Sequence, residues 1–448
     1  MATSRAANVV EAAVGHSGTA SVTTDVSNYG KKEYGEETGA KIKATIWNGK
    51  NSVKLVEMPK PRVVDPGDVI LRVTGSAICG SDLHLYHGSI IQLEQGDVLG
   101  HEFCGVVESA GPAATNVKVG DRVVAAFPIC CGECMYCKKG LTSSCERTND
   151  DTIINAMYGK RSAGIFGYSH FTGGFAGGQA EYVRVPYADH NLLRLPDDVP
   201  DEKGLYLSDV LATAWHCVVD TGVNLDDVVA VWGAGPIGQM VVDFSFLHGA
   251  SRVILIDGGD GGWRLDFVKS KIPKVETLDY TRLPRGESVR SQLKEMVHGG
   301  PDVALECAAG EYSKGWMHYF EQMFGMEMDT SEILNEMITS VRPFGRVGIT
   351  GVYTGYTNHL NIGAVMQTGV RLIGNGQAPV QRYWERILEL VRQQQIDPLA
   401  MVTHRVRLED IEKLYPLFNE RQHGIQKVFI ETQFSAAPAA GTPALTEL

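Results

Sequence analysis

The stretch VVAVWGAGPIG, from Val228 to Gly238, decides the fold of this chain. Its first five residues are apolar, which is typical of a buried strand, and the glycines that follow at once open a helical stretch. Glycines there allow a tight turn, a close approach of the backbone to a pyrophosphate and close packing of the helix, whose N-terminus favours phosphate. The stretch therefore predicts a dinucleotide site formed by Gly233, Gly235, Pro236, Ile237 and Gly238.

Asp257 ends the strand that is predicted after this helix. A carboxylate at this place accepts hydrogen bonds from ribose hydroxyls and repels a 2′-phosphate, so NAD is favoured over NADP as the cofactor. The loop from Gly258 to Arg264 keeps NADP open as an alternative, because Arg264 is able to turn toward a 2′-phosphate.

The order of strands and helices predicts two domains, one inserted into the other. From about Val228 to Gly374 strands alternate with helices, which is the pattern of a parallel doubly wound sheet. From Lys41 onward, strands alternate with turns as in a small, partly closed barrel. We therefore expect a poorly ordered tail over 1–40, a barrel domain over 41–210 and 375–434, a nucleotide-binding domain over 211–374, and a flexible tail over 435–448.

Four cysteines form one Cys-x2-Cys-x2-Cys-x7-Cys run: Cys131, Cys134, Cys137 and Cys145. Thiols so close in a short loop can occupy the corners of a tetrahedron, the geometry of a structural zinc site. An iron–sulfur cluster and a disulfide lattice are the alternatives, since the first three cysteines have a ferredoxin-like spacing. No proline follows the last cysteine, no secretory signal is recognised and nine cysteines cannot all pair, so zinc is favoured.

A second set of metal-binding residue types is spread over three motifs: CGSDLH at 79–84, GHE at 100–102 and LSDVLAT at 207–213. Together with the cysteine run and the glycine-rich stretch, they resemble the zinc-dependent medium-chain dehydrogenase/reductase family, which includes the alcohol dehydrogenases. The resemblance covers about residues 41 to 432. The third motif has Asp209 where the family usually has cysteine, and this departure resembles the glutathione-independent formaldehyde dehydrogenase branch.

The resemblance implies an α/β fold in which a GroES-like, partly closed β-barrel carries the catalytic site and a Rossmann domain with a doubly wound parallel sheet binds the nucleotide. It also implies a catalytic zinc held by Cys79, His101 and Asp209, with one coordination position left open. With the cysteine lobe, this makes two zinc ions per chain.

Neighbouring residues take catalytic roles from the same resemblance. Ser81 relays a proton from the substrate and His84 passes it to solvent, because a hydroxyl both donates and accepts and a histidine titrates near neutrality. Asp82 is expected to fix the ring of His101, and Glu102 is expected to lie behind the metal.

Four further residues have two interpretations each. Thr213 matches a family threonine at the nicotinamide ring, or is a helix-start hydroxyl, and Phe127 either lines the substrate pocket or is a core aromatic. Lys427 either reaches the pyrophosphate or is a solvated strand lysine. Cys130 breaks the spacing of the cysteine run, and we expect a small buried side chain rather than a ligand.

Charge and composition narrow the function. The net charge is −12 and the pI about 5.6, which argues against binding to nucleic acid or to an anionic membrane, and no apolar run approaches the length of about 20 residues that a membrane helix needs. We expect a cytoplasmic homo-oligomer, a dimer or tetramer, whose partner is a small-molecule alcohol or aldehyde.

The predicted function is a zinc-dependent oxidoreductase that transfers hydride between NAD(H) and an alcohol/aldehyde pair. A glutathione-independent formaldehyde dehydrogenase or dismutase with tightly held NAD is one alternative. A catalytically idle NAD-binding scaffold is the alternative from another class, and the complete set of ligand and relay residues argues against it.

Overall fold

The computed structural model describes residues 35, 38–259, 262–308, 330–353, 355 and 357–448, and its chain divides into two units. Unit 1 contains residues 1–212 and 379–448, and unit 2, residues 213–378, is inserted between these segments. The tail expected over 1–40 lies outside the described residues, apart from residues 35 and 38–40.

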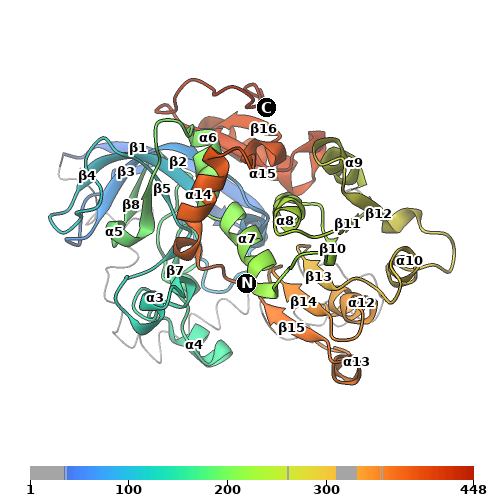
Figure 1. The fold of residues 1–448 in the computed structure, drawn as a ribbon. Coiled ribbons are helices and arrows are strands. Elements are labelled where there is room, and N and C mark those ends of the chain that lie inside the picture. The colour runs from blue at the N-terminus through green and yellow to red at the C-terminus, as the bar shows by residue number, and fades with distance from the viewer. Residues whose placement is uncertain (1–34, 36–37, 260–261, 309–329, 354, 356) are drawn as a thin grey trace. The chain divides into compact units, whose positions relative to one another are not determined.

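A seven-stranded sheet organises unit 1 (Figure 1). In spatial order its strands are β16 (His404–Arg407), β17 (Val428–Glu431), β3 (Val69–Ser76), β4 (Phe103–Ala110), β5 (Arg122–Ala125) and β9 (Leu192–Arg194), and β8 (Tyr182–Val185) also pairs with β3. All pairs are antiparallel except β16 with β17. On the edge away from β4, β3 pairs with β8 through its first half and with β17 at its end. The register of β3 with β4 is irregular at two places, which is typical of a strand that bends from one partner to the next.

The hairpin of β1 (Lys41–Gly49) and β2 (Ser52–Pro59) joins this sheet through isolated bridges from Ala44 to Ala180 and from Ile46 to Val98. Buried side chains of β3, β4, β5 and β8 meet in one apolar core. The predicted partly closed barrel is therefore confirmed. Helices α2 (Gly80–Tyr86), α6 (Asp201–Gly204), α14 (Trp384–Arg392) and α15 (Ile411–Asn419) complete the larger part of unit 1.

A small lobe of unit 1 holds the cysteine run. It contains β6 (Pro128–Ile129), α3 (Met135–Lys138), η2 (Thr142–Ser144), α4 (Thr152–Tyr158) and β7 (Gly164–Ile165), and β6 pairs with β7. Elements this short bury little apolar surface, so the lobe depends on another source of stability.

Unit 2 is a six-stranded sheet in which every pair is parallel. The spatial order is β12 (Glu276–Asp279), β11 (Arg252–Asp257), β10 (Val228–Trp232), β13 (Val303–Glu306), β14 (Arg346–Ile349) and β15 (Arg371–Gly374). Counted along the chain this is the order 3-2-1-4-5-6 of a doubly wound dinucleotide fold, and the strand order reverses between β10 and β13. The predicted Rossmann topology is confirmed.

Helices cover the sheet of unit 2 because its strands are apolar on both faces. One face packs against α10 (Val289–Met296) and α12 (Glu332–Ser340), while α8 (Pro236–Leu247) contacts β10 and β11. Helix α9 (Gly262–Lys271) contacts β11 and β12. None of the described helices is long and apolar enough to cross a membrane.

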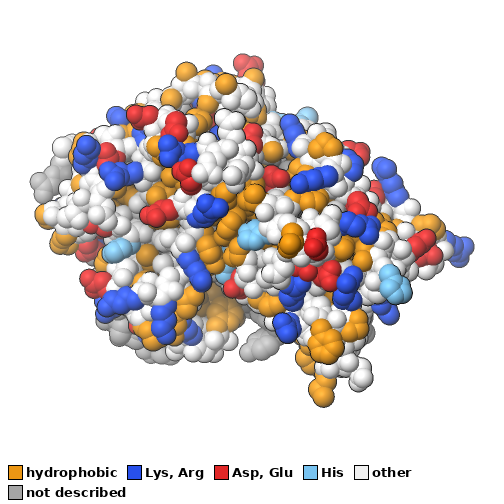
Figure 2. Space-filling model, viewed as in Figure 1, with side chains coloured by type: hydrophobic (Ala, Val, Ile, Leu, Met, Phe, Trp, Pro, Cys, Tyr) orange, Lys and Arg blue, Asp and Glu red, His pale blue; other side chains and the backbone are white. Residues whose placement is uncertain are grey.

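Apolar side chains are exposed around α13 (Ile362–Thr368), at the end of unit 2 where Figure 2 shows a group of hydrophobic side chains. Phe344, Ile362 and Met366 are 76%, 65% and 87% exposed. Large exposed apolar side chains mark surfaces that contact other molecules. The homo-oligomer expected from the sequence stays a prediction.

The C-terminal segment from residue 435 differs from the flexible tail that its Pro/Ala/Thr composition predicts. The buried Arg405 donates to the carbonyl of Ala436 at 3.2 Å, and its own carbonyl accepts from the Thr446 N–H at 2.8 Å. Glu202 accepts from the Ala439 N–H at 3.1 Å. The composition is that of a mobile chain, but these distant backbone and side-chain partners hold the segment on unit 1.

Arg405 is held by two carboxylates, Glu202 and Glu431, each at 2.6 Å. Removing one partner of a buried ion pair typically costs about 3–5 kcal/mol, because the other charges stay buried and unpaired. We therefore expect Arg405→Met to lower the thermal unfolding temperature and to speed amide hydrogen exchange over residues 436–446.

Arg407→Met is the matched control, since the Arg407 side chain is 55% exposed and 3.9 Å from Glu431. It should cost less than about 1 kcal/mol and leave exchange in the C-terminal segment unchanged. Equal effects of the two substitutions would contradict the anchoring role of Arg405.

Candidate metal centres and nucleotide-binding turn

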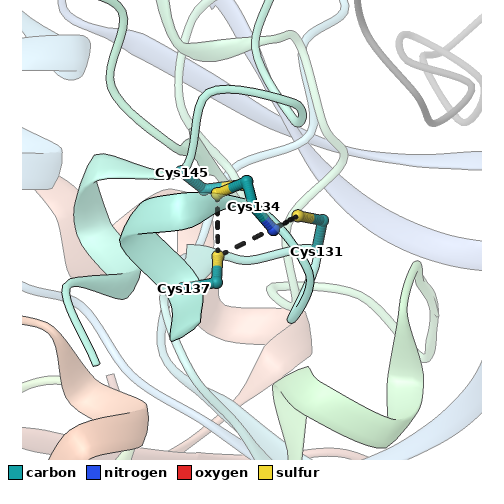
Figure 3. A group of neighbouring side chains, drawn as sticks. All are labelled: Cys131, Cys134, Cys137 and Cys145. Carbon is teal, nitrogen blue, oxygen red and sulfur yellow. Dashed lines mark hydrogen bonds between the residues drawn. The ribbon is translucent and has the colours of Figure 1, made fainter. Parts of the chain in front are cut away.

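The four cysteines of the run come together beside the short helix α3 (Figure 3). Their sulfur atoms all lie within 4.8 Å of one another, with Cys134 Sγ 3.4 Å and Cys131 Sγ 4.0 Å from Cys137 Sγ. A tetrahedral zinc with Zn–S bonds of about 2.3 Å separates its sulfur ligands by about 3.8 Å. The cluster therefore has the dimensions of a structural zinc site.

The electrostatics of this cluster call for a cation. Hydrogen bonds from Cys137 and Cys145 lower the pKa of Cys131, so one thiolate forms readily. The pKa of Cys137 is raised, by Cys130 first and then by Cys131, and the pKa of Cys145 is raised first by Cys131. Further thiolates are resisted because like charges crowd together, and a divalent metal removes that resistance.

Cys130 is 2% exposed, as the sequence predicts, but it also packs with the cysteines of the run. It packs in the same buried cluster as Cys131, Cys134 and Cys145, and its thiol interacts with Cys137. Its Sγ also lies 3.9 Å from the His190 carbonyl. Gly132, at φ +74°, is required beside this histidine, because a Cβ there would lie 2.2 Å from the His190 ring.

A second cluster joins residues that are far apart in the sequence. Ligand atoms of Cys79, His101, Glu102 and Asp209 lie within 4.8 Å of one another. Asp209 Oδ2 is 3.5 Å from His101 Nε2 and 4.0 Å from Cys79 Sγ. Cys79 precedes α2, His101 precedes β4, and Asp209 precedes α7 (Val210–Thr221), so element ends carry the three predicted ligands.

The chemistry of this donor set fits zinc. Sulfur, nitrogen and carboxylate oxygen are the ligand types that zinc accepts in catalytic sites. Among the described residues, no donor reaches Glu102 Oε2, although the atom is buried. Burial alone would lower the pKa of His101, but Asp82 and Asp209 outweigh it and hold that pKa well above its usual value. A bound cation would interact favourably with the acidic groups of this cluster and with Glu102 Oε2, which is unpaired among the described residues.

Asp82 links two of the candidate ligands. Its Oδ1 lies 3.1 Å from His101 Nδ1, and its Oδ2 accepts from the Cys79 N–H at 2.9 Å. The contact to Nδ1 directs Nε2 toward Asp209 and Cys79, which is the orientation that the predicted role of Asp82 requires.

Sequence reasoning missed the support behind Asp82. Gln179 Nε2 lies 3.5 Å from Asp82 Oδ2, and Gln179 Oε1 accepts from the Tyr415 hydroxyl at 3.0 Å. Both residues are fully buried. The Gly177-Gly178 pair before Gln179 could have indicated this close packing from the sequence, because two glycines in a row often mark a close backbone approach. A Cβ at Gly178 would lie 2.3 Å from the Phe103 ring.

The structure places Lys427 differently from both roles that the sequence suggests for it, a contact to the pyrophosphate and a solvated position on a strand. Its Nζ lies 2.6 Å from Glu102 Oε1, and both side chains are 1% exposed. It is therefore neither solvated nor free to reach a pyrophosphate, because either position would leave Glu102 buried without its cation. Glu102 lies 3.9 Å from His101 Nε2, so the ion pair sits directly behind the ligand cluster.

The relay candidates lie on α2. Ser81 Oγ is 3.5 Å from His101 Nε2, and His84, one turn later, is 7% exposed. The Phe127 ring meets the His101 ring edge-on, with centroids 6.3 Å apart, so this aromatic lies at the cluster. A second aromatic that the sequence did not single out, Tyr168, meets the same ring at 6.2 Å.

The glycine-rich turn of unit 2 is built as the sequence predicts a dinucleotide turn to be. Gly233 has φ +99°, and a Cβ there would lie 2.8 Å from the Cys307 carbonyl oxygen. A Cβ at Gly238 would lie 1.8 Å from the Gly233 oxygen, so the helix packs directly on the turn. Nothing lies within 4 Å of the missing Cβ of Gly235, which leaves that side of the backbone open to a ligand.

Helix α8 begins with Pro236 at its first position, followed by Ile237, and both are half-buried. Asp257 ends β11, and its carboxylate accepts from the N–H groups of Ala234 and Gly258, each at 2.8 Å. The acid therefore joins the turn to the end of β11, where a ribose would be recognised. Thr213 belongs to the first turn of α7, in unit 2.

Comparison with known proteins finds relatives that cover most of the chain. The model of the alcohol dehydrogenase GroES-like domain matches residues 65–197. A zinc-type alcohol dehydrogenase-like protein of Schizosaccharomyces pombe is 35% identical over 427 residues, 95% of this chain and 97% of the relative. A glutathione-independent formaldehyde dehydrogenase of Pseudomonas aeruginosa is 30% identical over 414 residues, 87% of this chain and 96% of the relative.

The solved structure of alcohol dehydrogenase TADH from Thermus sp. ATN1 superposes with a TM-score of 0.73 at 29% identity, covering 87% of this chain and 100% of that one. Identity and coverage of this extent over nearly the whole length of both proteins show the protein family. The chain belongs to the zinc-dependent alcohol dehydrogenases of the medium-chain dehydrogenase/reductase family.

Proposed function

We propose that this oxidoreductase transfers hydride between NAD(H) and a small alcohol/aldehyde pair at a zinc held by Cys79, His101 and Asp209. One observation carries the proposal: the Ser81 hydroxyl lies 3.5 Å from His101 Nε2, one of the three candidate ligand atoms that gather in the cluster. A relay hydroxyl beside a metal site with a mixed sulfur, nitrogen and oxygen donor set is suited to moving the proton of an alcohol.

The residues of the chain divide the work as follows. Zinc would supply a Lewis acid that polarises the substrate oxygen, and NAD, held at Gly233, Gly235 and Asp257, would supply the hydride acceptor. Ser81 takes the proton from the substrate hydroxyl and passes it toward His84, three residues later on the same helix.

Glu102 and Lys427 hold their charges behind the site, and Asp82 keeps the His101 ring in place. Phe127 and Tyr168 flank that ring, which favours compact substrates. Thr213 is proposed to contact the nicotinamide.

The test is a screen of short-chain and aromatic alcohols and aldehydes with NAD and with NADP, followed by NADH or NADPH absorbance. Turnover that requires zinc and prefers NAD supports the proposal. No turnover of any substrate in protein with two bound zinc ions would favour the idle scaffold.

Asp209 gives a reason to test a second activity, because it resembles the third ligand of the glutathione-independent formaldehyde dehydrogenases. Such an enzyme acts on formaldehyde without glutathione. A dismutase that keeps its NAD would convert two formaldehyde molecules and one water into formate and methanol in equal amounts. The measurement is product formation with neither glutathione nor added NAD.

The structural zinc is tested by Cys134→Ser. Losing one thiolate leaves a partly coordinated metal, and metal binding in such a lobe is folding free energy. We expect zinc content to fall from two ions to one and the lobe to lose stability, as measured by elemental analysis and thermal unfolding. Cys104→Ser, a buried thiol outside the cluster, is the control and should keep both ions. Two zinc ions in well-folded Cys134→Ser would refute the site.

The third catalytic ligand is tested by two substitutions of Asp209. Asp209→Ala should remove the catalytic zinc and reduce kcat by about 100-fold or more, whereas Asp209→Cys keeps the ligand charge and should keep zinc with altered activity. NAD affinity should change little in both. Retention of two zinc ions and near-normal rates in Asp209→Ala would point to Glu102 as the ligand.

Cofactor choice is tested by Asp257→Ala. The substitution removes both an acceptor for ribose hydroxyls and a repulsion toward 2′-phosphate, so kcat/KM with NAD should fall by about 10- to 100-fold while the preference over NADP relaxes. The exposed Asp266 of α9 serves as control, and Asp266→Ala should leave the ratio unchanged. A wild type that already prefers NADP would assign the choice to Arg264.

A further inference from the structure

A buried acid ends the central strand of unit 2. Strand β13 has the sequence VALE, from Val303 to Glu306, and all four of its residues are 0% exposed. A carboxylate so deeply buried costs free energy unless hydrogen bonds hold it. In the register, Glu306 lies between Trp232 of β10 and Ile349 of β14. It therefore lies at the carboxyl end of the sheet, beside the point where the strand order reverses and where open α/β sheets bind ligands.

Two backbone N–H groups hold the Glu306 carboxylate. Its Oε1 accepts from the Ala308 N–H at 2.7 Å, and its Oε2 accepts from the Gly351 N–H at 2.6 Å. Ala308 follows β13 and Gly351 follows β14, each by two residues. One side chain therefore connects the segments that leave two neighbouring strands, through the strong bonds that a carboxylate forms with N–H groups.

The segment after β13 lies directly against the glycine-rich turn. The Cys307 N–H donates to the Trp232 carbonyl at 2.8 Å, so β10 and β13 stay joined up to the turn. A Cβ on Gly233 would lie 2.8 Å from the Cys307 oxygen and 3.0 Å from Ala308 Cα. The backbone that Glu306 holds is thus adjacent to the predicted pyrophosphate site.

The two halves of a dinucleotide lie on opposite sides of such a turn. In a doubly wound sheet each half of the strands binds one mononucleotide, and the pyrophosphate lies at the turn between them. Asp257 ends β11, so the adenosine half belongs to the side of β11 and β12, and the nicotinamide half belongs to the side of β13 and β14. Glu306 lies on the nicotinamide side.

We propose that Glu306 is a positioning residue for the nicotinamide half of the cofactor. Its buried carboxylate fixes the backbone at the ends of β13 and β14, which this half of the cofactor contacts. The inference rests on the proposed function and deepens it, because it assigns cofactor binding to a residue outside the glycine-rich turn. Glu306 acts through Ala308 and Gly351 and needs no contact of its own with NAD.

The test compares the affinities for NAD and for AMP, which carries the adenosine half alone. It uses the full chain with two zinc ions, freed of copurified nucleotide, and titration calorimetry in which AMP competes with NAD. Glu306→Gln keeps the size of the side chain, but its amide has one acceptor oxygen where two N–H groups need one each. We expect the Kd of NAD to rise about 10-fold or more, the effect of one hydrogen bond to a charged group, and the Kd of AMP to rise less than about 3-fold.

Asp302→Asn is the matched control from the other end of the same strand. Asp302 precedes β13, and its Oδ2 accepts from the Val228 N–H at 2.9 Å, so the substitution also weakens the bond of a carboxylate to a backbone N–H. This bond lies at the amino end of the sheet, away from the edge that binds ligands. Asp302→Asn should lower the thermal unfolding temperature and leave both Kd values unchanged, whereas Asp257→Ala should weaken both ligands.

A second variant covers the case in which Glu306→Gln does not fold. Glu306→Asp keeps the charge and both acceptor oxygens but draws them back by one methylene. It should raise the Kd of NAD by less than Glu306→Gln does, and again change the Kd of AMP little. Equal weakening of NAD and AMP in a folded variant, or an unchanged Kd of NAD, would overturn the proposal.

The same measurements separate this role from the proposed function. A wild type that binds NAD but turns over no alcohol or aldehyde would refute the proposed chemistry, while the comparison of NAD with AMP would still decide the role of Glu306. A wild type that binds neither NAD nor NADP would refute both.

Discussion

Buried negative charge is the constraint on which unit 1 depends. Asp82, Glu102, Asp209 and the Cys79 thiol meet in one small volume, where an unpaired ion would cost several kcal/mol. Lys427 neutralises Glu102, and the His101 ring lies between Asp82 and Asp209. A divalent metal bound here would complete this balance, so the candidate site and the stability of the surrounding unit would share one cause. In the cysteine lobe, crowded thiols instead of carboxylates resist carrying negative charge together without a cation.

Close backbone approach is how the chain gathers these groups. His101 follows Gly100, whose backbone lies against Gly167 and Gly177 and whose missing Cβ would meet Gln179. Each contact excludes a side chain, so the segments cannot slide past one another without a clash. A ligand on such a support keeps its direction before any metal binds, which is the condition for a well-defined coordination site.

Two features of this protein could be predicted from the spacing of residues within short stretches of the sequence. The turn at Gly233 and the run from Cys131 to Cys145 each lie within a few residues, so the sequence carries their geometry directly. The three candidate ligands that are distant in the sequence were predicted through resemblance, because periodicity alone does not pair Cys79 with Asp209. Tyr168 and Gln179 were missed because their importance comes from tertiary contacts across the barrel. The contacts of the C-terminal segment could not be expected for the same reason, since its composition says nothing of Arg405.

The pair of Glu102 and Lys427 joins residues 325 positions apart, with the whole of unit 2 lying between them in the sequence. During synthesis, the three candidate ligands and Glu102 leave the ribosome long before Lys427, the cation that neutralises Glu102. Unit 2 has its own core and can fold in that interval, whereas unit 1 waits for strand β17. A premature stop shortly before Lys427 therefore removes both strand β17 and the cation of Glu102, so unit 1 cannot complete the metal centre although every candidate ligand has already been made.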